Sequence, residues 1–166
     1  MGSQGLQIEE NDRFERGEWA FERIAWVVMA AIVAAALVGL FGGLGVFASR
    51  QASAAAGALT VEYPGLTRYT AKTDLRITTG TAAVSEGQVA LTLSSDWVDG
   101  ADINQVIPEP DTWESTPDGL RLTFPAGAAP PEVRISYRPD AIGSHPGTVT
   151  VGEAGPAVDF QQFVYP

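Results

Sequence analysis

Three regularly spaced aspartates are the first residues whose type and spacing could do chemistry. Asp96, Asp99 and Asp102 recur every three residues around Gly100, so a tight turn could bring their carboxylates together. Ca²⁺ takes about six to eight oxygen ligands, which makes these three residues weak candidates for a metal site. The spacing is not that of an EF-hand loop, and turn formation explains these residues more simply.

A single histidine and the lack of cysteine restrict the remaining chemistry. Without cysteine the chain has no disulfide, no thiolate nucleophile and none of the usual zinc sites. A hydrolytic triad would need a serine, this histidine and an acid. Ser144 adjoins His145, but neither a nucleophile elbow nor a glycine-rich oxyanion loop is present. We therefore predict no catalytic residue and no cofactor, and we expect His145 to lie in a solvent-exposed turn.

Length and charge narrow the class of protein further. The chain has 166 residues, enough for one folded domain plus an anchor. Its 10 basic and 20 acidic side chains give a formal net charge of -10. An acidic balance argues against nucleic acid as a partner, because phosphate backbones are bound by clustered lysine and arginine.

An uncharged run from Ile24 to Ala48 predicts a transmembrane helix, since about 20 apolar residues cross the hydrocarbon of a bilayer. Three arginines lie shortly before the run, at positions 13, 16 and 23, against one shortly after it, Arg50. This bias predicts a cytoplasmic N-terminus and an extracytoplasmic C-terminal domain, and therefore a span in the cytoplasmic (inner) membrane. The expected organisation is an acidic N-terminal segment (1–23), the transmembrane helix (24–48), a linker (49–57) and a β-domain (58–166).

Two further features bear on this anchor. Ala52-Ser53-Ala54 has the spacing of a signal-peptide cleavage site, but the apolar run is longer than the roughly 7–15 residues of a signal sequence. An uncleaved signal-anchor is therefore favoured, and cleavage stays open. Small residues recur four apart, on one face of the helix, and would let another helix approach closely. They are Ala31, Ala35, Gly39 and Gly43.

After Ala58 the sequence changes to short runs in which apolar residues alternate, separated by glycine, proline and aspartate. Period-two alternation is typical of half-buried antiparallel strands. About seven such runs predict an antiparallel, immunoglobulin-like β-sandwich, with a small barrel as the alternative. The runs are Leu59–Tyr63, Leu75–Ile77, Val89–Leu93, Leu120–Phe124, Val133–Tyr137, Val149–Val151 and Val158–Phe160.

The alternation lapses between Ser94 and Glu114, where two tryptophans and two prolines occur. We expect a long connection there, and long ordered loops often carry binding residues. Trp97 and Trp113 are the aromatic residues of this stretch that could anchor a protein contact, and filling the core is the equal alternative for them.

Several segments together resemble a family of uncharacterised bacterial single-pass membrane proteins with a C-terminal extracytoplasmic β-sandwich. The resemblance covers roughly residues 23–166, and its motifs are structural rather than catalytic. It implies a partner, because genes of this family tend to lie near one for a multi-pass membrane protein. The segments that carry it are Arg23–Ala30, Leu59–Tyr63, Thr67–Arg76, Ile107–Pro110 and Phe160–Pro166.

These observations predict an accessory protein without enzymatic activity, anchored in the lipid bilayer beside an integral membrane partner. The first alternative is a membrane-tethered domain that binds a ligand or a metal. The second is an anchored hydrolase.

Overall fold

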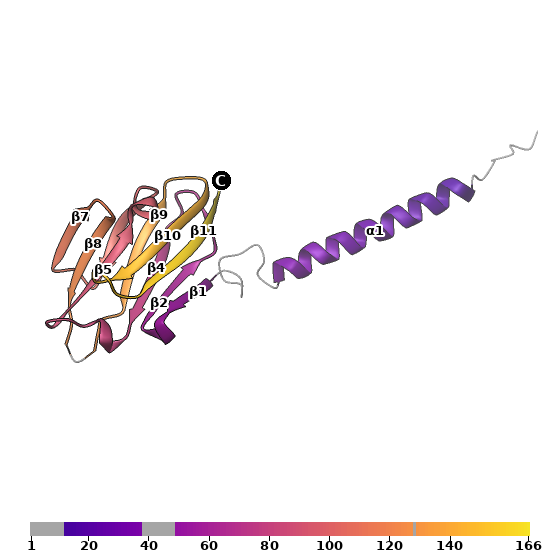
Figure 1. Cartoon of the computed structure of the whole chain (residues 1–166). Coiled ribbons are helices and arrows are strands. Elements are labelled where there is room, and N and C mark those ends of the chain that lie inside the picture. The colour runs from indigo at the N-terminus through magenta and orange to yellow at the C-terminus, as the bar shows by residue number, and fades with distance from the viewer. Residues whose placement is uncertain (1–11, 38–48, 128) are drawn as a thin grey trace, which may run out of the picture.

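The computed structural model describes residues 12–37, 49–127 and 129–166 of the chain (Figure 1). Beside the helices and strands, short 3₁₀ turns occur at Ala55–Gly57 and Thr81–Ala83. In chain order the elements are α1 (Asp12–Leu37), β1 (Ser49–Ala54), β2 (Leu59–Pro64), β3 (Leu66–Arg68), β4 (Thr73–Thr79), β5 (Gln88–Ser94), α2 (Ser95–Val98), β6 (Ala101–Ile107), β7 (Thr112–Thr116), β8 (Gly119–Pro125), β9 (Val133–Pro139), β10 (Gly143–Val151) and β11 (Ala157–Tyr165).

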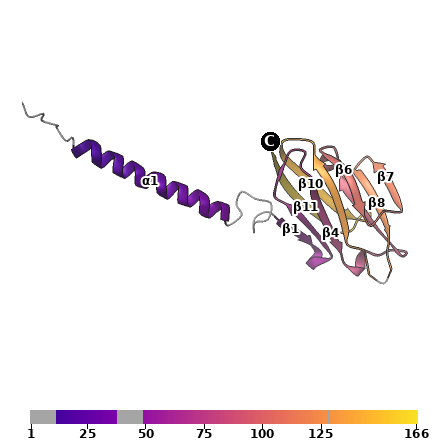
Figure 2. The ribbon, with the colours of Figure 1, turned by 180° about the vertical axis from the view of Figure 1, so that it is seen from behind.

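Two sheets face each other and enclose the core of a β-sandwich (Figures 1 and 2). The five-stranded sheet has the order β1-β2-β4-β9-β6, and the six-stranded sheet has the order β3-β11-β10-β5-β8-β7. Neighbouring strands are antiparallel except β3, which pairs with β11 in parallel. The chain passes from one sheet to the other at Gly65, between β2 and β3.

Alternation of buried and more exposed side chains along the central strands builds most of this core. Along β11, for example, every second residue from Val158 to Val164 is buried and the residues between are exposed. Burial of one face of each sheet supplies the hydrophobic driving force. All seven alternating runs of the sequence form strands, so the prediction of an antiparallel β-sandwich is confirmed.

The predicted number of about seven strands is too low, because the described residues form eleven. The missed strands are β1, β3, β6 and β7, and each lies at an edge of its sheet. Residues 49–57, expected to be a linker, instead contain β1, which pairs with β2 along its whole length. The stretch from Ser94 to Glu114, expected to be a long connection, contains α2, β6 and most of β7. An edge strand has a hydrogen-bonded neighbour on one side only. The opposing sheet also covers less of its inner face, so its apolar residues need not alternate.

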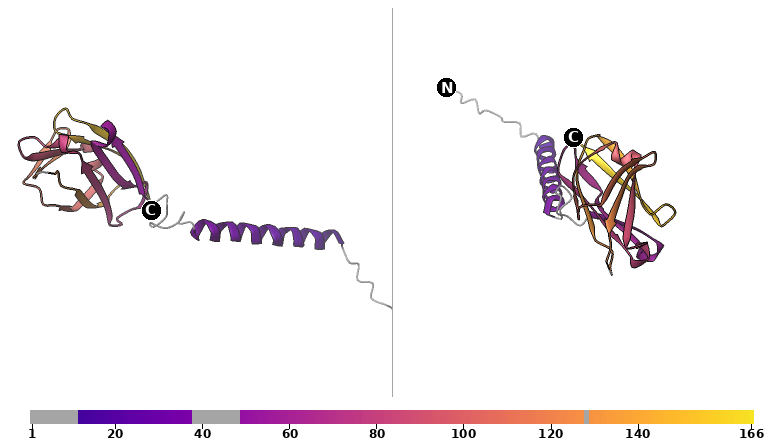
Figure 3. Two further views of the ribbon diagram at one scale, coloured as in Figure 1. Left: turned by 90° about the horizontal axis from the view of Figure 1, so that it is seen from below. Right: turned by 90° about the vertical axis from the view of Figure 1, so that its left-hand side faces the viewer.

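Helix α1 lies apart from the two sheets (Figure 3). It begins at Asp12, and the side chains of residues 22–34 are exposed. Within the described part of the chain, no helix combines the length and apolar character needed to cross a membrane. The predicted transmembrane segment 24–48 extends beyond this part, because residues 38–48 lie outside it.

Candidate functional site

A buried polar network lies inside one end of the sandwich, centred on the amide of Gln162. The side chain of this β11 residue is 1% exposed. Its Oε1 accepts hydrogen bonds from Trp97 Nε1 at 3.2 Å and from the hydroxyl of Tyr137 at 2.7 Å. Its Nε2 donates to the carbonyl oxygen of Pro64 at 3.0 Å. The amide therefore joins α2 and strands of both sheets.

His145 lies beside this network and is 4% exposed, so the expectation of a solvent-exposed turn is wrong. The residue belongs to β10, on the buried face that also carries Gly147 and Val149. Proline has no backbone N–H to donate to a neighbouring strand. Pro146 is tolerated in β10 because β5 pairs with β10 only from Val149 onward, so no strand on that side needs an N–H from position 146. The glycine and proline around His145 therefore lie within a strand.

The imidazole of His145 has a defined hydrogen-bonding state. Its Nε2 lies 3.0 Å from the carbonyl oxygen of Trp97, which can only accept, so Nε2 carries the proton. Nδ1 is buried and has no hydrogen-bond partner among the residues that the structure describes. Burial lowers the pKa of His145 from its ordinary value of 6.5, although the bond to Trp97 acts in the opposite direction. The fold thus holds this histidine in its neutral form.

Tyr137 completes the network from the opposite sheet. Its ring meets the Trp97 ring edge-on, with centroids 4.8 Å apart. Burial raises the pKa of its hydroxyl well above the ordinary value, and the hydrogen bond to Gln162 offsets only part of that effect. Both groups are inaccessible to a substrate, so the network acts as a structural element.

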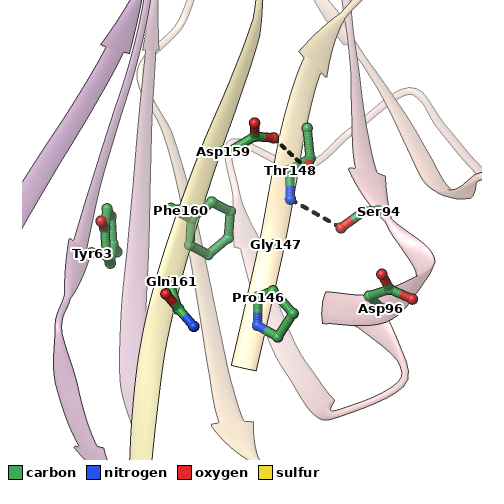
Figure 4. Close-up of a pocket in the computed structure, with 9 residues that line it drawn as sticks. All are labelled: Tyr63, Ser94, Asp96, Pro146, Gly147, Thr148, Asp159, Phe160 and Gln161. Carbon is green, nitrogen blue, oxygen red and sulfur yellow. Dashed lines mark hydrogen bonds between the residues drawn. The ribbon is translucent and has the colours of Figure 1, made fainter. Parts of the chain in front are cut away.

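An open depression of about 500 Å³ lies over β10 and β11 near α2 (Figure 4). Thr148 joins its walls: its hydroxyl donates to Asp159 at 2.8 Å, and its backbone N–H donates to Ser94 Oγ at 3.0 Å. Asp96 lies at the α2 side of the depression. Carboxylate and hydroxyl groups at an open surface can hold a polar ligand by hydrogen bonds.

Gly147 shapes the floor of this depression. A Cβ at this position would lie 2.5 Å from Phe160 Cζ, so the ring fills the space that a side chain would need. Phe160 in turn packs on Tyr63, with ring centroids 5.1 Å apart. Both rings are almost wholly buried, so they are not available to stack on a ligand.

A second groove of about 530 Å³ lies between the edge strands β6 and β7, and its lining includes apolar side chains. Trp113 is 50% exposed there and Ile107 is 48% exposed. Trp113 stands opposite Leu122 of β8, on the face of the sheet that turns toward the core. The five-stranded sheet does not cover it at this edge. The groove residues are Gln105, Val106, Ile107, Glu109, Pro110 and Trp113.

The two tryptophans considered as contact residues differ in their exposure. Trp97 is 0% exposed, because α2 turns its ring into the end of the sandwich. It cannot anchor a partner, so of the two roles left open for it the structure supports a place in the core. Trp113 lies in the β6–β7 groove with half of its surface accessible, so it stays a candidate.

The aspartates proposed as metal ligands do not form a metal centre. Asp96 lies on α2, Asp99 follows that helix, and Asp102 lies on β6, where its carboxylate accepts a hydrogen bond from Asn104. Among the residues that the structure describes, no group of three or more acidic or histidine side chains could hold a metal ion.

The helix-packing residues are only partly described. Ala31 is exposed on α1, and Ala35 belongs to the same helix, but Gly39 and Gly43 lie outside the described residues. A shallow apolar groove occupies another face of the helix, formed by Trp26, Met29, Ala30, Val33 and Ala34.

Comparison with known proteins gives no assignment. No protein-family model matches the chain. No curated protein has a significant sequence match to it.

The Gln162 network predicts unequal effects of two substitutions on one strand. Gln162→Leu leaves Trp97 Nε1 and the Tyr137 hydroxyl without an acceptor, so we expect a loss of about 2–5 kcal/mol in the free energy of unfolding. Gln161→Leu changes the neighbouring exposed residue and should cost less than about 0.5 kcal/mol. Urea denaturation of the full chain in mild detergent, followed by tryptophan fluorescence, measures both. Similar losses in the two variants would contradict the role given to Gln162.

The buried His145 predicts a specific loss of stability in acid. Because its folded pKa is below 6.5, the unfolded chain binds the additional proton. Stability should therefore be complete above pH 6.5 and fall as the pH drops below it, by at most about 1.4 kcal/mol per pH unit.

His145→Gln removes this titration while keeping a donor for the Trp97 carbonyl. The change in melting temperature between pH 7.5 and pH 5.5 should shrink in this variant. The sequence has one histidine, so equal slopes in the two proteins would contradict the assignment.

Proposed function

We propose that this chain is a single-pass, membrane-anchored accessory protein that presents its β-sandwich outside the cytoplasmic membrane, next to an integral membrane partner. The observation that carries the proposal is the exposure of α1. Within residues 22–34, its large apolar side chains are each more than half exposed, from 51% at Met29 to 68% at Val27. Exposed apolar surface of this extent is unfavourable in water and marks a contact with lipid or protein.

The apolar character continues beyond the described part of the helix. The sequence carries no charge from Ile24 to Ala48, a length that suits a bilayer. The arginine bias on its two sides favours a cytoplasmic N-terminus. Trp26 lies near the N-terminal end of the run, where an indole ring can settle among lipid headgroups.

Strand β1 supports an anchor that is retained. The candidate cleavage motif Ala52-Ser53-Ala54 forms the second half of β1, and Ala52 and Ala54 stand opposite Val61 and Leu59 of β2. Cleavage after Ala54 would remove the edge strand of the five-stranded sheet and expose β2. An uncleaved anchor keeps this strand.

The β6–β7 groove is the proposed contact with the partner. It combines an accessible tryptophan with apolar neighbours, and aromatic residues of this kind dominate the energetics of protein interfaces. Edge strands also offer unpaired backbone groups to a partner. The small-residue face of the helix at Ala31, Ala35, Gly39 and Gly43 is the proposed contact within the bilayer.

Two finer statements belong to the same proposal. The β-domain is immunoglobulin-like, which its two facing, mainly antiparallel sheets support. The chain is a member of the family of uncharacterised bacterial single-pass proteins that its sequence resembles. A tethered ligand-binding domain is the second candidate function, favoured by the polar depression over β10 and β11.

The proposed topology predicts which engineered cysteines react from outside the cell. The chain has no native cysteine, so Ser3→Cys and Ser85→Cys each introduce a unique thiol. In spheroplasts, a membrane-impermeant maleimide should label position 85 directly and position 3 only after permeabilisation. The protein should also stay in the membrane pellet after alkaline carbonate extraction. Release into the supernatant, or labelling of position 3 first, would overturn the proposal.

The proposed contact predicts a strong effect of Trp113→Ala on partner binding. The integral protein that co-purifies in mild detergent should be lost about thirtyfold, corresponding to a hot spot of about 2 kcal/mol. Ser115→Ala, which changes another exposed residue of the same strand, is the matched control and should retain the partner. Equal retention by the two variants with unchanged melting temperatures would exclude the groove.

A further inference from the structure

A second exposed apolar surface lies where β3 runs beside the end of β11, and we name it the β3–β11 corner. Phe163 stands opposite Leu66, and Tyr165 stands opposite Arg68. Ile142 precedes Gly143, which pairs with Val164, so it lies at the same end of β11. The apolar members of the corner are Leu66 (54% exposed), Tyr69 (38%), Ile142 (59%), Phe163 (50%) and Tyr165 (44%).

The backbone holds this corner in place. The N–H of Phe163 donates to the carbonyl oxygen of Gly65 at 3.0 Å, and the N–H of Tyr69 donates to that of Tyr165 at 2.8 Å. The N–H of Thr70 donates to the carbonyl oxygen of Pro139 at 3.0 Å, across to the other sheet. The exposed rings therefore stand on a hydrogen-bonded framework.

Basic side chains accompany the apolar ones. Arg68 belongs to β3, and Lys72 follows it in the connection to β4. Arg50 reaches the corner from β1, because a Cβ on Gly65 would lie 2.5 Å from its Nε. Among the described residues, none of these three forms an ion pair, whereas Arg76 and Arg121 pair with glutamates. Three basic side chains without an ion pair among the described residues thus gather at this corner, in a chain of net charge -10.

The corner lies next to the point where the apolar run joins the domain. The run ends at Ala48, and the following residue, Ser49, pairs with Pro64, which directly precedes Gly65. The end of β11 lies at this same end of the sandwich (Figure 1). An apolar run embedded in a bilayer up to Ala48 would therefore hold the corner close to the lipid surface.

We infer that the β3–β11 corner rests on the outer surface of the bilayer and binds anionic lipid headgroups. Tyrosine and phenylalanine favour the interface between headgroups and hydrocarbon, and arginine and lysine attract anionic lipid. Because β1 begins at Ser49, directly after the apolar run, the domain is held at the membrane, and weak contacts suffice to orient it. This inference rests on the proposed membrane anchor and assigns a further surface, distinct from the β6–β7 groove.

Acidic residues at the same end determine how the domain tilts. Asp99 precedes Gly100 on the α2–β6 side, and Asp140, whose backbone N–H donates to the Gly100 carbonyl oxygen, lies between that side and Ile142 of the corner. Anionic headgroups repel that side and attract the side of Arg50 and Arg68. The domain therefore leans on the β3–β11 corner and turns the α2–β6 side away from the bilayer.

Fluorescent probes on engineered cysteines test this orientation. Ile142→Cys places a probe at the corner, and Ser85→Cys places one in the exposed turn before β5, where β4 has carried the chain to the opposite end. The full chain is labelled with an environment-sensitive fluorophore and reconstituted into vesicles of phosphatidylcholine with or without phosphatidylglycerol. Nitroxide-labelled lipid then quenches any probe that touches the bilayer.

We expect a blue-shifted emission and at least threefold stronger quenching at position 142 than at position 85, increased by phosphatidylglycerol. Arg68→Glu should reduce the quenching at position 142 at least twofold. Arg134→Glu, on the exposed face of β9, is the charge-matched control and should leave it unchanged. Equal quenching at positions 142 and 85 would overturn the inference.

Flotation of the same vesicles separates this failure from a failure of the anchor. If the chain floats with the vesicles but the probe at position 142 stays in water, the lipid contact is wrong and the anchor stands. Shielding of position 142 that needs a membrane protein, and is absent in pure lipid, also overturns the lipid contact. If the chain does not float, the proposed function and the inference fall together.

Discussion

The buried amide of Gln162 is the interaction on which the arrangement of the sandwich depends. Its three hydrogen bonds reach Trp97 on α2, Tyr137 on β9 and the carbonyl of Pro64 at the end of β2. A buried amide is costly unless it is satisfied, so these partners have to keep their places together. The network thereby fixes the alignment of the two sheets at this end and closes it with the Trp97 ring.

The accessible aromatic residues lie outside this network, in two separate parts of the sandwich. Trp97 and His145 are buried and hydrogen-bonded in or beside the network, so neither is available to a ligand. Trp113 remains accessible because the opposing sheet does not cover it at the edge, and Phe163 remains accessible because it lies on the outer face of β11. The β6–β7 groove and the β3–β11 corner are therefore two separate surfaces. We propose the first as a contact with a protein and the second as a contact with lipid headgroups.

The helix and the sandwich differ in the exposure of their apolar side chains. The sandwich buries its large apolar side chains between two sheets, whereas α1 leaves Val27 and its neighbours exposed. A single chain that does both needs two different surroundings. This contrast, together with the length of the uncharged run, is the physical basis for proposing a membrane anchor.

The central strands could be predicted from the sequence because both of their neighbours and the opposing sheet act on them. Residues such as Leu75, Leu91 and Ile135 are fully buried and alternate with polar ones, which leaves a period of two in the sequence. Edge strands such as β1, with its small polar residues, carry no such signal. Their pairing depends on backbone hydrogen bonds, which any sequence without proline at the wrong position can form.

For the candidate site, the sequence determined which residue types are present, and the tertiary structure decided which of them are accessible. Trp97 and Trp113 are alike in the sequence, yet a single turn of helix buries the first and an uncovered sheet edge exposes the second. The Gly-Ser-His-Pro-Gly composition indicated a turn at His145, and strand pairing with β11 placed it in the core instead. Local composition sets what a segment can form, but contacts between residues far apart in the chain determine which side chains are left at the surface.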